Sequence, residues 1–301
     1  MLVSCPRFCR EFRCIAGDCP DTCCAKWEIV VDEASARKYR AAGGEIGDRL
    51  RQAMYEDDEG DTVFKNKNGR CPFLNPDNLC DIYSALGEKA LCRTCERFPR
   101  YSVSFGGYEE RGLSMSCPEA ARLIIENGFD FETELDDREP DINELDADLY
   151  FLLKSERDKI ARFFQDSVNV NKLSGLLEYS KKLRDFCKNP RGSAPKLTKG
   201  GALEGAILPK KPELLSEKGK ALEGLRFEGQ ALGEHSRNIF LYYLYRYFLA
   251  SVYDGEVALP LRLAVAAVLS AAALPFSIVE NAVLFSREIE HSESNLRMFG
   301  E

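Results

Sequence analysis

"CIAGDCPDTCC", residues 14–24, places four cysteines within eleven residues, and the last two, Cys23 and Cys24, are adjacent. Side chains of neighbouring residues on an extended chain point to opposite faces. Cys23 and Cys24 are therefore poorly placed as two ligands of one small tetrahedral ion, and they suit two irons of a larger cluster or two separate sites. The run predicts a metal-binding segment; the alternative is a set of buried thiols that act as small hydrophobes.

Two further stretches are expected to fold back and gather more thiols. In "CPFLNPDNLC" (71–80) the central turn residues predict a return of the chain that brings Cys71 close to Cys80. The pattern of "YSVSFGGYEERGLSMSC" (101–117) predicts a hairpin around two adjacent glycines, which brings the region of Cys95 beside Cys117.

The cysteine spacing favours iron over zinc. Structural zinc sites usually use pairs of CxxC knuckles, and Cys92–Cys95 is the one pair with that spacing here. Iron–sulfur clusters use looser spacings with a distant fourth ligand, to which this pattern is nearer. A structural zinc site stays open as an alternative.

Length and composition bound the class of protein. The chain has 301 residues, a net charge of −8 and a pI of about 5.2, which argues against nucleic acid as the main partner because phosphate binding needs a basic surface. The apolar stretches 238–253 and 263–276 are shorter than the roughly 20 residues of a membrane-spanning helix, so no membrane insertion is expected. No secretory signal is predicted, which indicates a cytoplasmic protein whose cysteines bind metal rather than form disulfides.

The distribution of cysteines predicts two domains. Eleven of the twelve cysteines lie at or before Cys117, so we expect a cysteine-rich metal-binding domain over residues 1–127 and a helical domain over residues 128–301. The predicted fold class is mainly α, with a loop-rich, cysteine-rich α+β N-terminal part that contains short hairpins. Residues 189–220, rich in Pro, Gly and Lys, are expected to form a loop or linker.

Individual elements follow from the same patterns. A strand is expected at 27–32 and a helix at 33–44, while leucine spacing predicts helices within 142–164 and 172–186. Three apolar helices are expected near 236–253, 260–274 and 276–292. The aromatic run at 240–248 and Trp27 are expected to be core, and His235 is expected at a helix start.

Six stretches together carry a resemblance to a known family: "FRCIAGDCPDTCCAKW" (12–27), "GRCPFLNPDNLCDIY" (69–83), "TCERFPRYS" (94–102), "LSMSCPEAARL" (113–123), "NIFLYYLYRYFLASVYDG" (238–255) and "SREIEHSESNL" (286–296). In these stretches the chain resembles the flagellin lysine-N-methylase family. The cysteine part alone is also similar to a broader group of iron- or zinc-chelating domains with CxxCC-like runs.

The resemblance implies methyl transfer to lysines of flagellin, with a [4Fe–4S] cluster and S-adenosylmethionine. The cysteines that fall on the family motifs are Cys14, Cys19, Cys23, Cys24, Cys71, Cys80, Cys95 and Cys117. Four cysteines lie outside them and are expected not to be essential ligands: Cys5, Cys9, Cys92 and Cys187.

Lysine methylation needs a base, because the lysine ammonium has a pKa of about 10.4 and cannot attack while protonated. His291 follows Arg287 by four residues and Glu288 by three, so a helix would place all three on one side. We expect His291 or Glu288 to accept the lysine proton and Arg287 to hold a carboxylate, with this helix packed toward the cysteine-rich part; the alternative is a solvated helix face.

Asp81 and Tyr83 directly follow Cys80 and are candidates for contacts to the cofactor, although ordinary turn residues are the alternative. The sequence contains no Gly-rich strand–turn–helix loop for a nucleotide, and a CxxxCxxC motif fails because Lys26 stands at its last position. An open iron of the cluster is therefore the expected seat for the methyl donor. A non-catalytic or redox iron–sulfur or zinc-binding protein is the alternative function.

Overall fold

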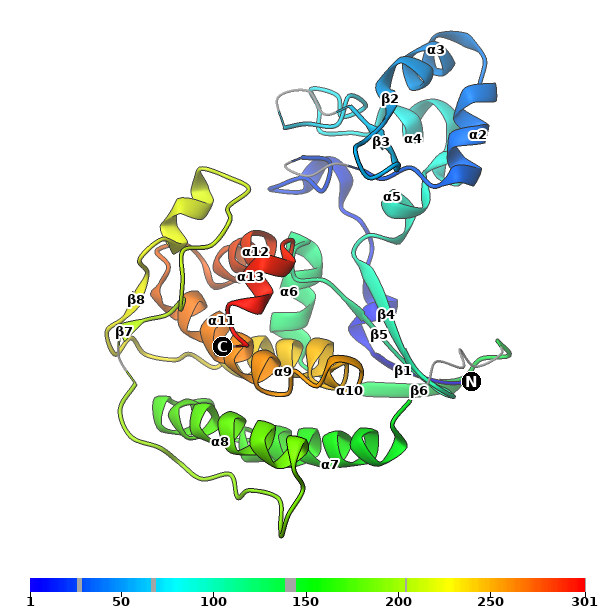
Figure 1. Ribbon diagram of the computed structural model, residues 1–301. Helices are drawn as coiled ribbons and strands as arrows, with labels where there is room; N and C mark the ends of the chain where they lie inside the picture. The colour runs from blue at the N-terminus through cyan, green and yellow to red at the C-terminus, as the bar shows by residue number, and fades with distance from the viewer. Residues whose placement is uncertain (26–28, 66–68, 139–144, 204, 301) are drawn as a thin grey trace. The chain divides into compact units, whose positions relative to one another are not determined.

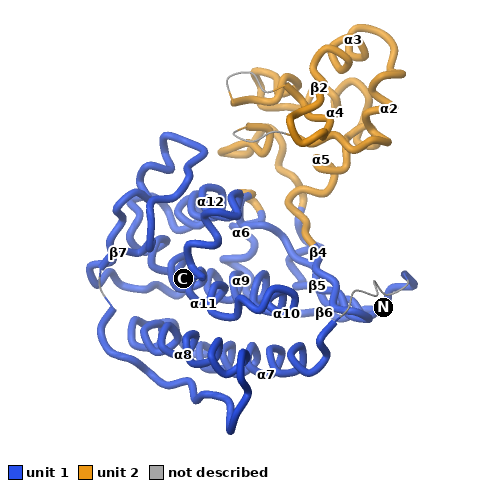
Figure 2. Tube along the Cα trace, in the orientation of Figure 1, with its two compact units in different colours: residues 1–12, 102–116, 120–301 blue, residues 13–101, 117–119 orange. Residues whose placement is uncertain are grey.

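The computed structural model describes residues 1–25, 29–65, 69–138, 145–203 and 205–300. The chain forms two compact units (Figure 2). Unit 1 consists of residues 1–12, 102–116 and 120–301, and unit 2 consists of residues 13–101 and 117–119. These bounds differ from the boundary at residue 127 expected from the cysteine distribution, because strands at both ends of the cysteine-rich region form a sheet with the later chain.

Unit 2 contains short helices and one small hairpin. The strands β2 (Met54–Glu56) and β3 (Thr62–Phe64) pair in an antiparallel manner. The helices are α2 (Glu33–Ala41), α3 (Gly44–Ala53), α4 (Asp81–Leu86) and α5 (Arg93–Arg97), and the 3₁₀ turns are η1 (Ala16–Asp18) and η2 (Glu88–Ala90). The expected helix at 33–44 is confirmed. The strand expected at 27–32 forms an isolated bridge between Val30 and Val63, and residues 27 and 28, with Trp27, lie outside the described residues.

A hydrophobic core supports the cysteines of unit 2. It is centred on Tyr39, Phe64 and Phe73, whose rings stack or meet edge to face at centroid distances of 5.9 and 4.9 Å. Cys92 is part of this core, and three half-buried thiols pack against it: those of Cys71, Cys80 and Cys95. The cysteine side chains are therefore held by apolar packing on one side.

The sheet of unit 1 has the strand order β4–β5–β1–β6. Its strands are β1 (Leu2–Pro6), β4 (Arg100–Phe105), β5 (Tyr108–Leu113) and β6 (Phe131–Leu135). β1 runs parallel to β5 and antiparallel to β6. The predicted hairpin is present as β4 and β5, and Gly106 supplies the positive φ of its turn.

The helix α11 lies among several other helices of unit 1, as Figure 1 shows. α11 is apolar all round, which is typical of a buried helix, and it contacts α8, α9 and α12. Helices of this unit are α1 (Phe8–Glu11), α7 (Ala147–Phe163), α8 (Val170–Lys188), α9 (Ser236–Tyr247), α10 (Ser251–Asp254), α11 (Ala258–Ala273), α12 (Ile278–Ile289) and α13 (Glu293–Arg297), while α6 (Pro118–Asn127) begins in unit 2. A two-stranded pair joins β7 (Gly205–Ala206) to β8 (Arg226–Phe227), and η3 spans Lys218–Leu222.

The predicted fold class is confirmed: the chain is mainly helical, with short strands in its cysteine-rich N-terminal part. The five helices predicted in the later part correspond to α7, α8, α9 with α10, α11, and α12. Over the described ranges, none of these helices combines the length and hydropathy needed to cross a bilayer. In the described part of 189–220, the regular elements are β7 and η3, in agreement with the predicted loop.

Candidate functional site

The loop 71–80 folds back as predicted. Leu74 and Cys80 form an antiparallel bridge, and the side chain of Asn75 accepts hydrogen bonds from the backbone N–H groups of Asp77 and Leu79 at 3.0 and 2.9 Å. Such a side-chain-stabilised turn is what asparagine favours. The two ends of the loop, Cys71 and Cys80, are thereby brought together.

This loop lies against the cysteine run that precedes it. The backbone N–H of Cys71 donates to the carbonyl of Cys24 at 2.8 Å. A Cβ placed on Gly17 would lie 3.5 Å from the Asp77 carbonyl oxygen, so η1 also borders the loop. The two cysteine-bearing segments are therefore in direct backbone contact.

Asp32 positions a third segment, which begins at Cys92. One Asp32 oxygen accepts from Ser35 N–H at 3.1 Å and caps α2, while the other accepts from Arg93 N–H at 2.8 Å at the start of α5. These hydrogen bonds hold the pKa of Asp32 at about 2, the contact with Arg93 being the largest cause. Asp32 thus ties α2 to the CxxC pair of α5.

Six thiols interact electrostatically within unit 2. The thiols of Cys80, Cys92 and Cys23 each influence the pKa of Cys71, which burial raises to about 11. Burial likewise raises the pKa of Cys80, and the nearby Cys23 thiol adds to this effect. The thiols of Cys24 and Cys71 both contribute to the raised pKa of Cys95. These residues come from three segments that are far apart in sequence, so the structure brings together five of the predicted ligands.

Cys92 belongs to the same group, although it lies outside the motifs that carry the family resemblance. Its side chain is 1% exposed, and its thiol lies 3.8 Å from the Val30 carbonyl oxygen. A hydrogen bond with the Cys95 thiol lowers the pKa of Cys92 to about 7 and raises that of Cys95. The CxxC spacing of Cys92 and Cys95 was the signal in the sequence for this contact.

The other predicted ligands have different surroundings. Cys14 is exposed, and its sulfur accepts from Ala16 N–H at 3.4 Å. Cys19 is half-buried, and Cys117 is buried at 9% exposure.

The donor set fits a thiophilic metal. Thiolates select zinc, copper(I) or iron–sulfur clusters over harder cations, and each of the twelve cysteines is a thiol rather than half of a disulfide. Within the described ranges, no three His, Cys, Asp or Glu side chains already stand around one point in a geometry that could hold an ion.

Asp81 and Tyr83, the predicted cofactor contacts, begin α4. An Asp81 oxygen lies 2.7 Å from Arg49 Nη2, which also donates to the Pro72 carbonyl at 3.2 Å. Asp81 thus ties α3 to the cysteine loop. Tyr83 is 51% exposed.

Two of the predicted catalytic residues, Arg287 and Glu288, lie in α12, and His291 follows the end of this helix, so the three do not share one helical face. Arg287 and Glu288 are buried, at 3% and 1% exposure, and Arg287 Nε donates to the Ser116 carbonyl at 2.6 Å. Glu288 accepts from the backbone N–H of Leu215 at 2.5 Å and from the Ser216 hydroxyl. Both side chains therefore hold neighbouring segments of unit 1.

The Glu288 contacts belong to a strap, residues 213–222, that lies across the end of α12. Asn295 holds the beginning of the strap: its oxygen accepts from Glu213 N–H and its amide donates to the Glu213 carbonyl, both at 2.8 Å. Gly219 lies directly against the Glu288 carboxylate, because a Cβ there would stand 2.5 Å from Glu288 Cδ.

His291 differs from the other two because it is an exposed residue. Its Nδ1 lies 3.0 Å from the carbonyl oxygen of Arg287. A carbonyl can only accept, so Nδ1 carries the proton of the neutral ring and Nε2 keeps its lone pair. His291 is thus the member of the trio whose geometry suits a proton acceptor.

The aromatic run at 240–248, expected to be core, contributes to a buried polar network in unit 1 that its composition does not predict. Its centre is Glu290, whose side chain is 5% exposed. The hydroxyls of Tyr242, Tyr243 and Tyr247 donate to Glu290 at 3.1, 3.0 and 2.5 Å, and Arg246 Nε lies 3.0 Å away. Burial is the largest cause that raises the pKa of all three tyrosines, so they stay neutral donors.

This network joins three of the stretches that carry the family resemblance. Tyr242 and its neighbours come from 238–255, Glu290 comes from 286–296, and the Tyr242 hydroxyl accepts from Met115 N–H at 3.1 Å in 113–123. The signal for it was Arg246, a charged residue within the largely apolar stretch 238–253, since a charged side chain must find a partner when buried.

Comparison with known proteins adds a family context. Residues 13–117 match the family model CxxCxxCC, described as "Putative zinc- or iron-chelating domain". The chain is 31% identical over 130 residues to "Flagellar biosynthetic protein FliU" of Salmonella muenchen. The matched region covers 40% of this chain and 75% of FliU. It is also 31% identical over 126 residues to "Lysine-N-methylase" of Salmonella typhimurium (strain LT2) and of Salmonella choleraesuis (strain SC-B67), covering 40% of this chain and 31% of each relative. No solved structure shows significant similarity.

Proposed function

We propose that this chain, which belongs to the FliB-like family of lysine-N-methylase and FliU proteins and carries its cysteine-rich domain, is a protein lysine N-methyltransferase that acts on flagellin in the cytoplasm. The methyl donor is S-adenosylmethionine and the metal centre is a [4Fe–4S] cluster. The observation that carries the proposal is the gathering of thiols in unit 2, within the region that matches a zinc- or iron-chelating domain.

The ligands are drawn from the motif cysteines. Cys71, Cys80 and Cys95 are the best supported, because they pack on one core and interact with one another, and Cys23 and Cys24 approach them from the adjacent run. Cys14, Cys19 and Cys117 complete the proposed set. When bound, the cluster would supply a Lewis-acidic iron with a coordination position for the donor.

The chain's own residues prepare the lysine. A lysine ammonium has no lone pair for attack on a methyl group, so its proton must move to a base. His291 is the proposed acceptor through Nε2, because Nδ1 is fixed as the donor to the Arg287 carbonyl. Arg287 and Glu288 act beside it by holding the segments on either side of α12.

The metal is tested first, on the full chain purified without oxygen. We expect a brown protein with about four irons per chain and matching acid-labile sulfide. Cys71→Ser should lower the iron content strongly, whereas Cys187→Ser, which changes a half-buried cysteine of α8 outside unit 2, should not. A colourless protein with stoichiometric zinc would contradict the cluster.

Methyl transfer is tested with S-adenosylmethionine labelled in its methyl group and purified flagellin. We expect label on flagellin lysines, and we expect His291→Ala to reduce the rate by about 10²- to 10⁴-fold, the usual contribution of a general base. His235→Ala is the matched control, because His235 is the other histidine and its side chain is also exposed. Iron without any labelled lysine would favour a redox or non-catalytic metal protein instead.

A further inference from the structure

Cys5 and Cys9 form a thiol pair in unit 1, separate in the chain from the cysteines of unit 2. Cys5 lies in β1 and Cys9 lies in α1, and between them Pro6 ends the strand while Arg7 adopts a helical conformation. This turn returns the chain so that Cys9 lies beside Cys5 and influences its thiol, and Cys5 itself is fixed in the sheet by its pairing with Glu132 of β6. Both side chains are half-buried, so a small molecule can reach them.

Charged side chains of three elements face Cys5. The positive charges of Arg111 in β5 and Arg10 in α1 favour the thiolate form of Cys5, and the negative charge of Glu134 in β6 disfavours it. The pKa of Cys5 is lowered, chiefly by the hydrogen bond with Cys9 and then by the two arginines, against burial and Glu134. A thiol in such surroundings has more of its reactive thiolate form at neutral pH.

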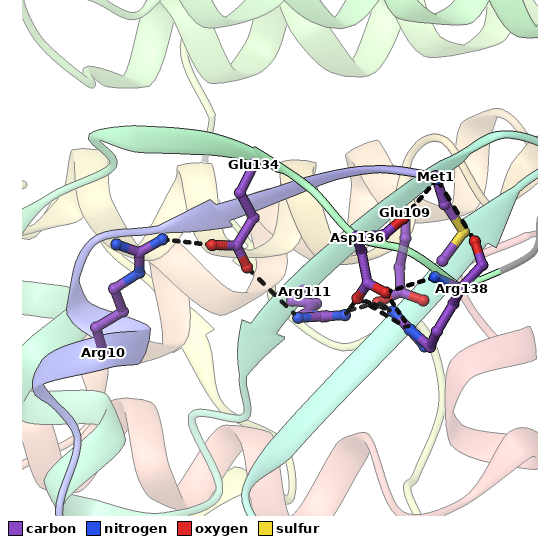
Figure 3. A network of polar contacts seen from close by, with 7 residues as sticks. All are labelled: Met1, Arg10, Glu109, Arg111, Glu134, Asp136 and Arg138. Carbon is purple, nitrogen blue, oxygen red and sulfur yellow. Dashed lines mark hydrogen bonds and ion pairs between the residues drawn. The ribbon is translucent and has the colours of Figure 1, made fainter.

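These arginines are held in place by an ion-pair network (Figure 3). Arg10 Nη2 lies 2.7 Å from Glu134, and Arg111 Nη2 lies 2.8 Å from Asp136. Glu109, which is 3% exposed, accepts from Arg111 Nε at 2.5 Å. Further pairs of the same network are Arg138 with Glu109 and with Asp136, and Arg10 with Glu132. The Arg111 side chain is 33% exposed and is fixed by this network, whereas the Arg10 side chain is 59% exposed and is held through its pairs with Glu132 and Glu134.

We propose that Cys5 and Cys9 form a redox-active dithiol that low-molecular-weight disulfides such as glutathione disulfide convert into an intramolecular disulfide. The inference does not depend on methyl transfer or on the metal.

The exchange takes place in two balanced steps. The Cys5 thiolate attacks one sulfur of glutathione disulfide, so that a Cys5–glutathione bond forms and one glutathione thiolate leaves and takes up a proton. Cys9 then loses its proton and attacks the Cys5 sulfur, which releases the second glutathione. Two protein thiols are oxidised and one glutathione disulfide is reduced to two glutathione molecules.

Cys187 is an internal control. It lies in α8 and is also half-buried, but burial raises its pKa to about 11. Since the thiolate fraction changes about tenfold for each pKa unit, Cys5 should react with a thiol-alkylating reagent at pH 7 at least about tenfold faster than Cys187.

The experiment incubates the full chain, without oxygen, at a series of ratios of glutathione to glutathione disulfide, followed by alkylation, trypsin and mass spectrometry. Trypsin cleaves after Arg7 and Arg10, so the disulfide links the peptide that ends at Arg7 to the peptide 8–10. We expect this linked pair to accumulate as the disulfide fraction rises. In the Cys9→Ser variant the exchange should stop after the first step, with glutathione bound to Cys5. The Cys187→Ser variant should form the linked peptides like the wild type.

Two results would overturn the proposal. One is an alkylation rate for Cys5 that does not exceed that of Cys187 in the folded protein. The other is the absence of both the linked peptides and the Cys5–glutathione adduct in Cys9→Ser, with far-UV circular dichroism showing that the variant is folded.

Discussion

Replacement of Glu290 by glutamine should destabilise unit 1 more than any conservative change at an exposed acid. The variant keeps the size of the side chain but removes the charge that accepts from three tyrosine hydroxyls and faces Arg246 at 3.0 Å. Loss of one partner of a buried ion pair costs about 3–5 kcal/mol. Because the Arg246 side chain is 20% exposed, water can solvate part of its charge, and we expect about 3 kcal/mol.

The assay is urea unfolding of the full chain, followed by far-UV circular dichroism, which reports mainly on the helices of unit 1. Glu293→Gln is the matched control: its side chain is 77% exposed and its pair with Arg297, four residues later, lies at the surface. Surface pairs of this kind contribute little to the free energy of unfolding, so the control should unfold at the same urea concentration as the wild type. A loss below about 1 kcal/mol for Glu290→Gln would refute the reasoning, because the network would then be dispensable for stability.

Two further variants test other contacts. Gly219→Ala should cost about 1–3 kcal/mol in unfolding free energy, because its Cβ would stand 2.5 Å from Glu288 Cδ, whereas Gly233→Ala, with open space around it, should cost nothing measurable in the same urea experiment. Asp32→Ala should cost about 1 kcal/mol at pH 6, because it removes a helix cap. The pKa of Asp32 is about 2 when folded and 3.8 without these contacts, so the ionised carboxylate stabilises the fold above about pH 3.8, and this contribution is lost as the pH falls toward 2. The difference between wild type and Asp32→Ala should therefore narrow between pH 4 and pH 2; a difference that stays constant there would contradict the assignment.

Local patterns in the sequence were enough for the elements and for part of the thiol group. The turn residues of 71–80 predicted that Cys71 and Cys80 would meet, and leucine spacing predicted the helices α7 and α8. These features depend on contacts between residues close in the chain, whose geometry is fixed by turn preferences and helical periodicity. The same locality explains why the paired glycines at 106 and 107 correctly predicted a hairpin.

Contacts between distant segments could not be predicted in this way. The aromatic run at 240–248 has the composition of core, and its periodicity does not reveal that three hydroxyls converge on Glu290. Likewise, Arg287, Glu288 and His291 are close in sequence but have different surroundings. Arg287 and Glu288 are buried and, as neighbours on a helix, contact different segments, whereas His291 follows the end of α12 and is exposed. The membership of Cys92 in the thiol group also depends on the position that Asp32 gives to α5.

The sequence by itself therefore determined the class of the fold, the cysteine-rich part and the family, since composition, spacing and motif residues are properties of the chain alone. The tertiary structure decided which polar side chains are buried and which partners they have. Folding placed β1 in one sheet with β5 and β6, and it brought Arg10 and Arg111 close to Cys5 and its partner Cys9. The physical reason is that a charge or thiol acquires its chemistry from its surroundings, and those surroundings are formed by segments that only folding brings together.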